Sequence, residues 1–344
     1  MKSLSKFPSK AAAVFDPAAY AFDVRKQVAA ESDYDGDVGI EIELEGENLP
    51  QGYGGPTTNG ITWVWHNDGS LRGGAEYVSS APIKRADLPK MLDDLFAYIA
   101  ASGGVIKNSN RCSTHVHLNM KGAKLNQIAA FVSLYGCFES VLSSWCGPVR
   151  EGNLFALRLE DCHYAVDGWK KCFVTGDFDW PNEMRYLALN PAALRKFGSL
   201  EVRTMGGVTS GETVVTWVDA LLRLKQMAVS PRFKDPAEIA MTLSSLGGRG
   251  FFDDVFGDLP FADEVCRMCG DDIEMTVRSG FRRIQPIIYS VSWAHALPEI
   301  EKVFIPRPFG EPPRKKKAPA ALRMRTAAPV VFDEPVAIRD EDDD

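Results

Sequence analysis

Three glutamates alternate with aliphatic residues between Val38 and Glu45, and this spacing is the first sign of chemistry in the chain. Glu41, Glu43 and Glu45 are two positions apart, so in a β-strand their carboxylates lie on one face. A row of like charges is tolerated on a solvated face, or where a bound cation turns the repulsion into ligation. Taken alone, the row favours the solvated face, and the rest of the sequence changes that balance.

Two further pairs of ionisable residues have the same spacing. His115 and His117 are separated by Val116, so both imidazoles lie on one face of the predicted strand 114–119. Glu201 and Arg203 repeat the arrangement in a later predicted strand. Neutral imidazoles and carboxylates together make sites for divalent metals. Three strands that combine acids with histidines therefore predict a metal site rather than an ordinary solvated sheet face.

Histidines and cysteines at these spacings have other interpretations. A His-x-His pair by itself is more often a surface or hydrogen-bonded pair, and a cupin barrel would need a glutamate soon after His117, which 120–124 lacks. Cys266 and Cys269 have zinc-site spacing, but no second pair of zinc ligands accompanies them. Cys112 has a nucleophile's chemistry, but core packing is the favoured interpretation.

Strand and helix patterns place these residues. Asn67 to Ser70 supplies a turn between the predicted strands 61–66 and 75–79, which form a hairpin carrying Asp68 and Glu76. Apolar residues at helical spacing predict helices, and alternation predicts two more strands. The predicted helices span 87–102, 125–145, 212–228, 236–246, 261–269 and 272–283; the further strands span 185–190 and 200–204; an irregular excursion spans 149–181.

Composition limits the class of protein. The 344 residues are 45% hydrophobic, enough for a sizeable core, and the net charge of −7 argues against general nucleic-acid binding. Seven scattered cysteines indicate a reducing compartment. No apolar signal region follows Met1 and no apolar run of about 18 residues occurs. We therefore expect a cytoplasmic protein without a membrane span.

Five short motifs, in this order, resemble those of the amidoligase family, which is similar in turn to glutamine synthetase and glutamate-cysteine ligase. The resemblance covers residues 38–228. The motifs are Gly39-Ile-Glu41-Ile-Glu43; Asn67-Asp68-Gly69-Ser70 with Glu76-Tyr77-Val78-Ser79; Cys112-Ser-Thr-His115-Val-His117; Tyr186-Leu-Ala-Leu-Asn190; and Leu200-Glu201-Val-Arg203.

The resemblance implies an α+β fold, in which a curved antiparallel sheet forms a half-funnel with helices on its outer face. It also implies ATP and two or three Mg²⁺ or Mn²⁺ ions. The implied metal ligands are Glu41 and Glu43, His115 on an ion shared with Glu41 and Glu201, and the hairpin acids Asp68 and Glu76. Arg203 is implied as a phosphate contact, and Arg185 and Asn190 as neighbours of the nucleotide or the acyl phosphate.

Four regions follow from this reading: a flexible arm over 1–35, an amidoligase-like catalytic core over 36–230, a helical part of the same domain or small subdomain over 231–305, and a disordered tail over 306–344. The tail carries a basic and an acidic block that could recruit a partner protein.

The resemblance implies an ATP-dependent carboxylate-amine ligase, which joins a free carboxylate of an amino acid, peptide or protein to an amine through an acyl phosphate. Two alternatives stay open: a non-catalytic structural or interaction protein with the same fold, and a metal-dependent hydrolase.

Overall fold

The computed structural model describes residues 36–52, 54–150, 152–175, 178 and 180–304. The predicted arm 1–35 and the predicted tail 306–344 lie outside these residues. The described residues up to Ile300 belong to one compact unit, so the predicted core 36–230 and the helices that follow it are not separate bodies. Of the second unit, 301–344, the structure describes only the last turn of a helix.

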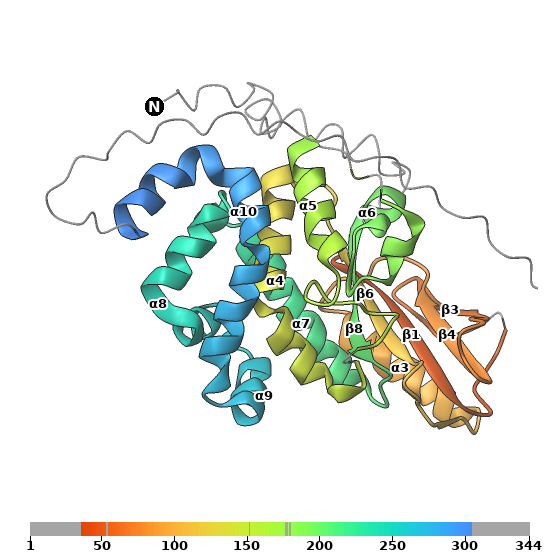
Figure 1. Ribbon diagram of the computed structural model, residues 1–344. Helices are drawn as coiled ribbons and strands as arrows, with labels where there is room; N and C mark the ends of the chain where they lie inside the picture. Colours follow the sequence, from red (N-terminus) through yellow and green to blue (C-terminus); the bar gives the residue numbers. More distant parts are fainter. Residues whose placement is uncertain (1–35, 53, 151, 176–177, 179, 305–344) are drawn as a thin grey trace, which may run out of the picture. The chain divides into compact units, whose positions relative to one another are not determined.

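The centre of the described chain is an antiparallel sheet that does not close into a barrel (Figure 1). Its strand order is β2-β3-β4-β1-β6-β8-β7, and β5 pairs with the end of β1. The strands are β1 (Val38–Glu47), β2 (Thr57–Thr58), β3 (Ile61–His66), β4 (Gly74–Ser79), β5 (Val105–Ile106), β6 (Ser113–Asn119), β7 (Leu189–Asn190) and β8 (Ser199–Gly206). The predicted α+β class and antiparallel sheet are confirmed.

Alternation along β1 separates the two faces of the sheet. Val38, Ile40, Ile42 and Leu44 are fully buried on one face, whereas the glutamates between them point to the other. The apolar face packs on α3 (Leu88–Ala101), α4 (Leu125–Cys146) and α7 (Gly211–Val229). The sheet thus buries its aliphatic face against helices, and its opposite face carries the ionisable side chains.

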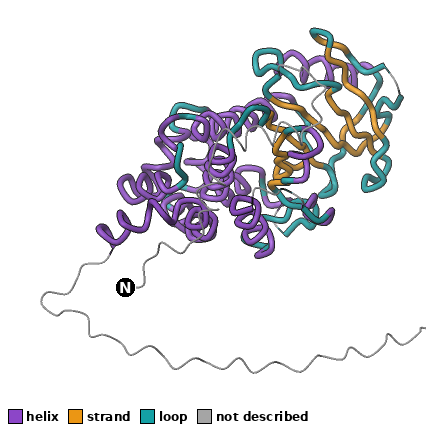
Figure 2. Tube along the Cα trace, turned by 90° about the horizontal axis from the view of Figure 1, so that it is seen from above, coloured by secondary structure: helices purple, strands orange, loops and turns teal. Residues whose placement is uncertain are grey.

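Three more helices form a layer beyond α4 and α7 (Figure 1), and Figure 2 shows most of the helices gathered at one end of the molecule and the strands at the other. They are α8 (Ala237–Phe256), α9 (Pro260–Cys269) and α10 (Asp272–Phe304). Aromatic rings fill the contact: Phe138 of α4 lies 5.1 Å, centroid to centroid, from Phe251 and from Phe256 of α8. The helical part therefore shares its core with the sheet-bearing part.

Two sequence expectations were wrong in this region. The predicted strand 185–190 is instead the end of the short helix η3 (Asn182–Tyr186) and the two-residue β7, because the N–H groups of Met184 and Leu187 donate to carbonyls three residues back. The predicted irregular excursion contains α5 (His163–Thr175). Buried Ala165, Trp169 and Phe173 recur every four residues there, a helical period that the charges between them obscured.

The remaining predicted helices are present with longer bounds. α8 consists of two helical halves that meet in a kink at Gly247, and the second half continues the helix past the predicted end at residue 246. The φ of 74° at Gly247 is a backbone conformation that glycine adopts readily. α10 continues past residue 283 to Phe304. The smaller elements are η2 (Pro148–Arg150), α6 (Ala192–Phe197) and η4 (Pro231–Phe233).

Helix α4 is, by length and composition, long and apolar enough to cross a membrane, which the sequence reading did not anticipate. It is the one such helix in the described chain, and 83% of its most apolar window is buried inside the protein. Core helices pass the same test, so α4 by itself does not decide where the protein resides.

Candidate metal and anion site

The ionisable residues form a continuous row across four strands. Strand pairing sets Glu43 opposite Glu76 of β4, and Glu41 opposite His115 of β6. His117 is paired with Glu201 of β8, and Glu201 in turn with Asn190 of β7. Residues paired across an antiparallel sheet point to the same face. The sheet therefore gathers residues that are up to 160 positions apart in the sequence (41 to 201).

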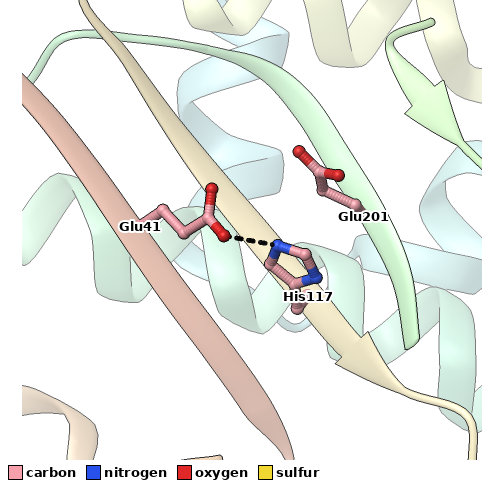
Figure 3. Close-up of side chains that lie close together, drawn as sticks. All are labelled: Glu41, His117 and Glu201. Atoms are coloured by element: carbon pink, nitrogen blue, oxygen red, sulfur yellow. Dashed lines mark hydrogen bonds and ion pairs between the residues drawn. The ribbon is translucent and has the colours of Figure 1, made fainter. Parts of the chain in front are cut away.

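The first candidate cation group comprises Glu41, His117 and Glu201, each of which places a ligand atom within 4.8 Å of the others (Figure 3). Nε2 of His117 lies 3.0 Å from Oε1 of Glu41, while its Nδ1 lies 3.0 Å from the hydroxyl of Ser199. Ser199 thus fixes the ring so that Nε2 faces the two carboxylates, as an oriented histidine ligand requires.

The second candidate group comprises Glu43, Asp68 and Glu76, also within 4.8 Å of one another. Asp68 comes from the turn between β3 and β4, where it accepts a hydrogen bond from the Ser70 backbone N–H at 2.6 Å. Burial, followed by the negative charges of Glu41, Glu43 and Asp68, raises the pKa of Glu76 to about 8. The carboxylates here lack compensating positive charge, a condition that a bound cation would relieve.

His115 lies between the two groups and is buried. Its Nδ1 is 3.0 Å from Oε2 of Glu41 and 3.6 Å from Oε1 of Glu201, and its Nε2 is 2.7 Å from the Ser113 hydroxyl. That hydroxyl donates to Glu43. Both ring nitrogens of His115 are therefore engaged, as are those of His117, so the predicted ligand His115 and its neighbour His117 each turn one nitrogen toward Glu41.

The carboxylates of the first group are held ionised. Although burial alone would raise the pKa of Glu41, hydrogen bonds and positive charge from His115 and His117 keep that pKa well below its ordinary value. Burial likewise opposes ionisation of Glu201, but His117, His115 and Arg203 together lower its pKa. Carboxylates in this state are ready to act as ligands without losing a proton.

Arg203 joins the first group from β8. Its Nη1 forms an ion pair with Oε1 of Glu201 and lies 3.4 Å from Nδ1 of His115. Its Nε donates to the backbone carbonyl of Phe155 at 3.2 Å. The predicted acid and base on one strand face are thus in direct contact, at the edge of the carboxylate row.

Arg150 is a buried residue of the site that the sequence reading missed. The pairing of β6 with β8 has a bulge in which Arg203 and Thr204 oppose His115 alone. Arg150 donates to the carbonyl groups of both bulge residues, at 2.6 and 3.1 Å. Its burial lowers its pKa to about 10. No sequence period reveals a bulge, so nothing in the sequence marked Arg150.

Two predicted nucleotide neighbours have other contacts here. The side-chain amide of Asn190 donates to Glu201, and its oxygen accepts the backbone N–H of Ala192, so Asn190 orients Glu201. Arg185 is exposed and its guanidinium lies 4.7 Å from the centroid of the Tyr186 ring. Within the described residues, its recorded contacts are with Tyr186 and not with the carboxylates.

The structure gives no support to a nucleophilic Cys112 or to a zinc site at Cys266 and Cys269. Burial raises the pKa of the Cys112 thiol, which makes it a poor nucleophile. Among the described residues, neither Cys266 nor Cys269 belongs to a group of three possible metal ligands. The two carboxylate groups are therefore the candidate site among the described residues.

A scan against models of known protein families found no match to this chain, and a search of curated proteins found none either.

Proposed function

We propose that this protein is an ATP-dependent carboxylate-amine ligase. One observation carries the proposal: two candidate cation groups lie side by side on one sheet face, with Arg203 beside the first of them. Phosphoryl transfer depends mainly on positioning and on neutralising phosphate charge, which adjacent cations and an arginine provide. The resemblance of the five sequence motifs to amidoligases supports the same reaction.

The donor set fits hard divalent cations. Five carboxylates and one imidazole make up the two groups, and Mg²⁺ and Mn²⁺ prefer such oxygen-rich sites, whereas soft thiolate sites suit zinc. Glu41, His117 and Glu201 would hold one ion, and Glu43, Asp68 and Glu76 the other. Bound there, the ions supply neutralisation of phosphate charge. Tight zinc binding without nucleotide binding would instead favour the metal-dependent hydrolase.

The chain's own residues supply positioning. Arg203 offers guanidinium N–H groups to a phosphate oxygen, and the carbonyl of Phe155 together with Arg150 fixes where Arg203 lies. Ser199, Ser113 and Asn190 hold His117, His115 and Glu201 in fixed orientations. In the proposed reaction, the substrate carboxylate takes the γ-phosphoryl group of ATP and ADP leaves. An amine then attacks the acyl phosphate, and an amide forms with release of phosphate.

The test is calorimetric titration with a non-hydrolysable ATP analogue, with and without Mg²⁺. We expect binding that requires Mg²⁺ and that falls at least about 10-fold in Glu41→Gln. Glu47→Gln is the matched control, because Glu47 ends the same strand with its side chain 64% exposed and paired only with Lys107. The control should bind as the unmodified protein does.

Absence of nucleotide binding under any condition would contradict the ligase and favour the non-catalytic reading. If binding of the ATP analogue were independent of Mg²⁺, or equally strong in both variants, the carboxylate groups would not be part of the nucleotide site. Thermal unfolding of both variants checks that neither loses the fold.

A further inference from the structure

An exposed aromatic residue, Phe155, contacts Arg203 through its backbone. Phe155 is 39% exposed, although phenylalanine is usually buried. Its backbone carbonyl accepts the Nε–H of Arg203, the predicted phosphate contact, at 3.2 Å. The backbone of Phe155 therefore lies at the margin of the candidate site.

Phe155 is part of a small aromatic platform, which we define as Phe155, Tyr186 and Arg185. The Phe155 and Tyr186 ring centroids are 5.8 Å apart with the rings tilted by 69°, and the Arg185 guanidinium lies 4.7 Å from the Tyr186 centroid. An edge-to-face pair capped by a guanidinium leaves the Phe155 ring partly open to solvent.

Backbone hydrogen bonds hold the platform's two segments together. The N–H of Leu157 donates to the carbonyl of Tyr186 at 2.9 Å, and the N–H of Ala188 donates to the carbonyl of Leu157 at 2.7 Å. Leu157 and Leu187 form a parallel bridge. The platform is thus attached to the sheet by the same backbone that leads into Asn190, and its geometry is fixed in advance of any ligand.

The chemistry of the platform suits a planar, electron-rich ring. Aromatic faces and an arginine side chain stack on nucleobases without needing specific hydrogen bonds. The exposed Phe197 also has an aromatic partner, His117, and a cationic partner, Lys196, whereas Met241, 60% exposed, has neither among the contacts of the described chain.

We propose that the aromatic platform binds the base of the nucleotide whose phosphates contact Arg203. This inference rests on the proposed ligase function and deepens it. It also places Arg185 at the base of the nucleotide, which narrows the choice between nucleotide and acyl phosphate that the sequence resemblance leaves open for this residue.

The test compares two ligands in the presence of Mg²⁺: the non-hydrolysable ATP analogue and inorganic tripolyphosphate, which has phosphates but no base. Phe155→Ala removes the ring and keeps the backbone carbonyl that Arg203 contacts. We expect about a 10-fold loss of affinity for the ATP analogue and no change for tripolyphosphate. Arg185→Gln should show the same selective loss, and Met241→Ala on α8 is the control that should change neither.

Each other result overturns the assignment. Equal losses for both ligands would mean that Phe155 acts only through Arg203, and no loss would mean that the base lies elsewhere. If the unmodified protein bound both ligands equally well, the base would contribute no affinity; the platform assignment would then be wrong, and the proposed cation groups would be unaffected. Binding of neither ligand would overturn the proposed function together with the platform.

Discussion

Glu41 contacts two imidazoles at once, with Oε2 toward His115 and Oε1 toward His117. This double contact explains why its pKa is held low despite burial. Each histidine uses one ring nitrogen on a serine, His115 on Ser113 and His117 on Ser199, and turns the other toward Glu41. The two rings differ in burial rather than in partners, since His115 is the more deeply buried.

Glu139 shows the opposite electrostatic condition, well away from the carboxylate row. It is buried in α4, and both its oxygens accept the backbone N–H of Leu159. Burial raises its pKa to about 8, with Arg158 and Arg283 opposing the shift and Glu160 adding to it. The folded protein therefore favours Glu139 with its proton bound.

Because of Glu139, the free energy of unfolding depends on pH. In the unfolded chain the carboxyl loses its proton near its ordinary pKa of 4.5, but in the folded chain it keeps the proton until about pH 8. Unfolding releases a proton in this window, so stability falls as pH rises from 4.5 to 8. Glu139→Gln mimics the protonated form and should lack this loss.

Urea unfolding at pH 5.5 and pH 8 measures the effect. The free energy of unfolding of Glu139→Gln relative to the unmodified protein should be higher at pH 8 than at pH 5.5, by on the order of 2 kcal/mol. A difference that does not change with pH would show that Glu139 is ionised in the folded state.

At the scale of elements, α4 and α10 approach each other closely at two glycines. A β-carbon on Gly280 of α10 would lie 2.2 Å from the backbone carbonyl oxygen of Cys137. A β-carbon on Gly136 of α4 would lie 2.2 Å from a methyl carbon of Ile284. The backbones thus come together where neither helix has a side chain, and this crossing attaches the helical layer to α4.

Gly280→Ala should destabilise the protein by about 2 kcal/mol, because the new methyl group would clash with a backbone atom that cannot turn aside. In a freely exposed helix the same substitution would stabilise. Gly250→Ala in α8 is the control, since its β-carbon would meet only the exposed Leu246 side chain, at 3.2 Å. Thermal unfolding of both variants checks the prediction; equal midpoints would contradict the close crossing.

At the scale of the whole molecule, the sheet and the helical layer share one core. Phe138 and Trp145 of α4 pack against rings of α8 and α9, and Trp145 also stacks on Trp217 of α7 at 5.8 Å. The helices that support the sheet on one side are therefore covered by the helical layer on the other. The region of the motif resemblance, residues 38–228, does not contain its own complete core.

A chain that ends after Ser230 should therefore fail to fold cooperatively. Its α4 and α7 would expose aromatic rings that α8 and α9 cover in the full chain, and the lost burial exceeds the usual margin of stability. Urea unfolding followed by circular dichroism should show one sharp transition for the full chain and none for the shortened one. A sharp transition in the shortened chain would mean that the sheet is an independent unit.

The sequence by itself determined which residues share a face. Alternation at period 2 placed Glu41 with Glu43, His115 with His117, and Glu201 with Arg203, and turn residues predicted the hairpin that carries Asp68 and Glu76. Helices α3, α4 and α7 followed from apolar spacing. These features are local, because each depends on neighbours within a few positions of the chain.

Only the tertiary structure decided which faces meet and in what register. Strand β1 lies between β4 and β6, and β6 pairs with β8 although 79 residues (from 120 to 198) separate the two strands in the sequence. A shift of one residue in either pairing would turn the ligand atoms away from each other, and local patterns do not encode that choice. The bulge at Arg203 and Thr204, the engagement of Arg150, and the contact of both His115 and His117 with Glu41 all depend on this long-range pairing.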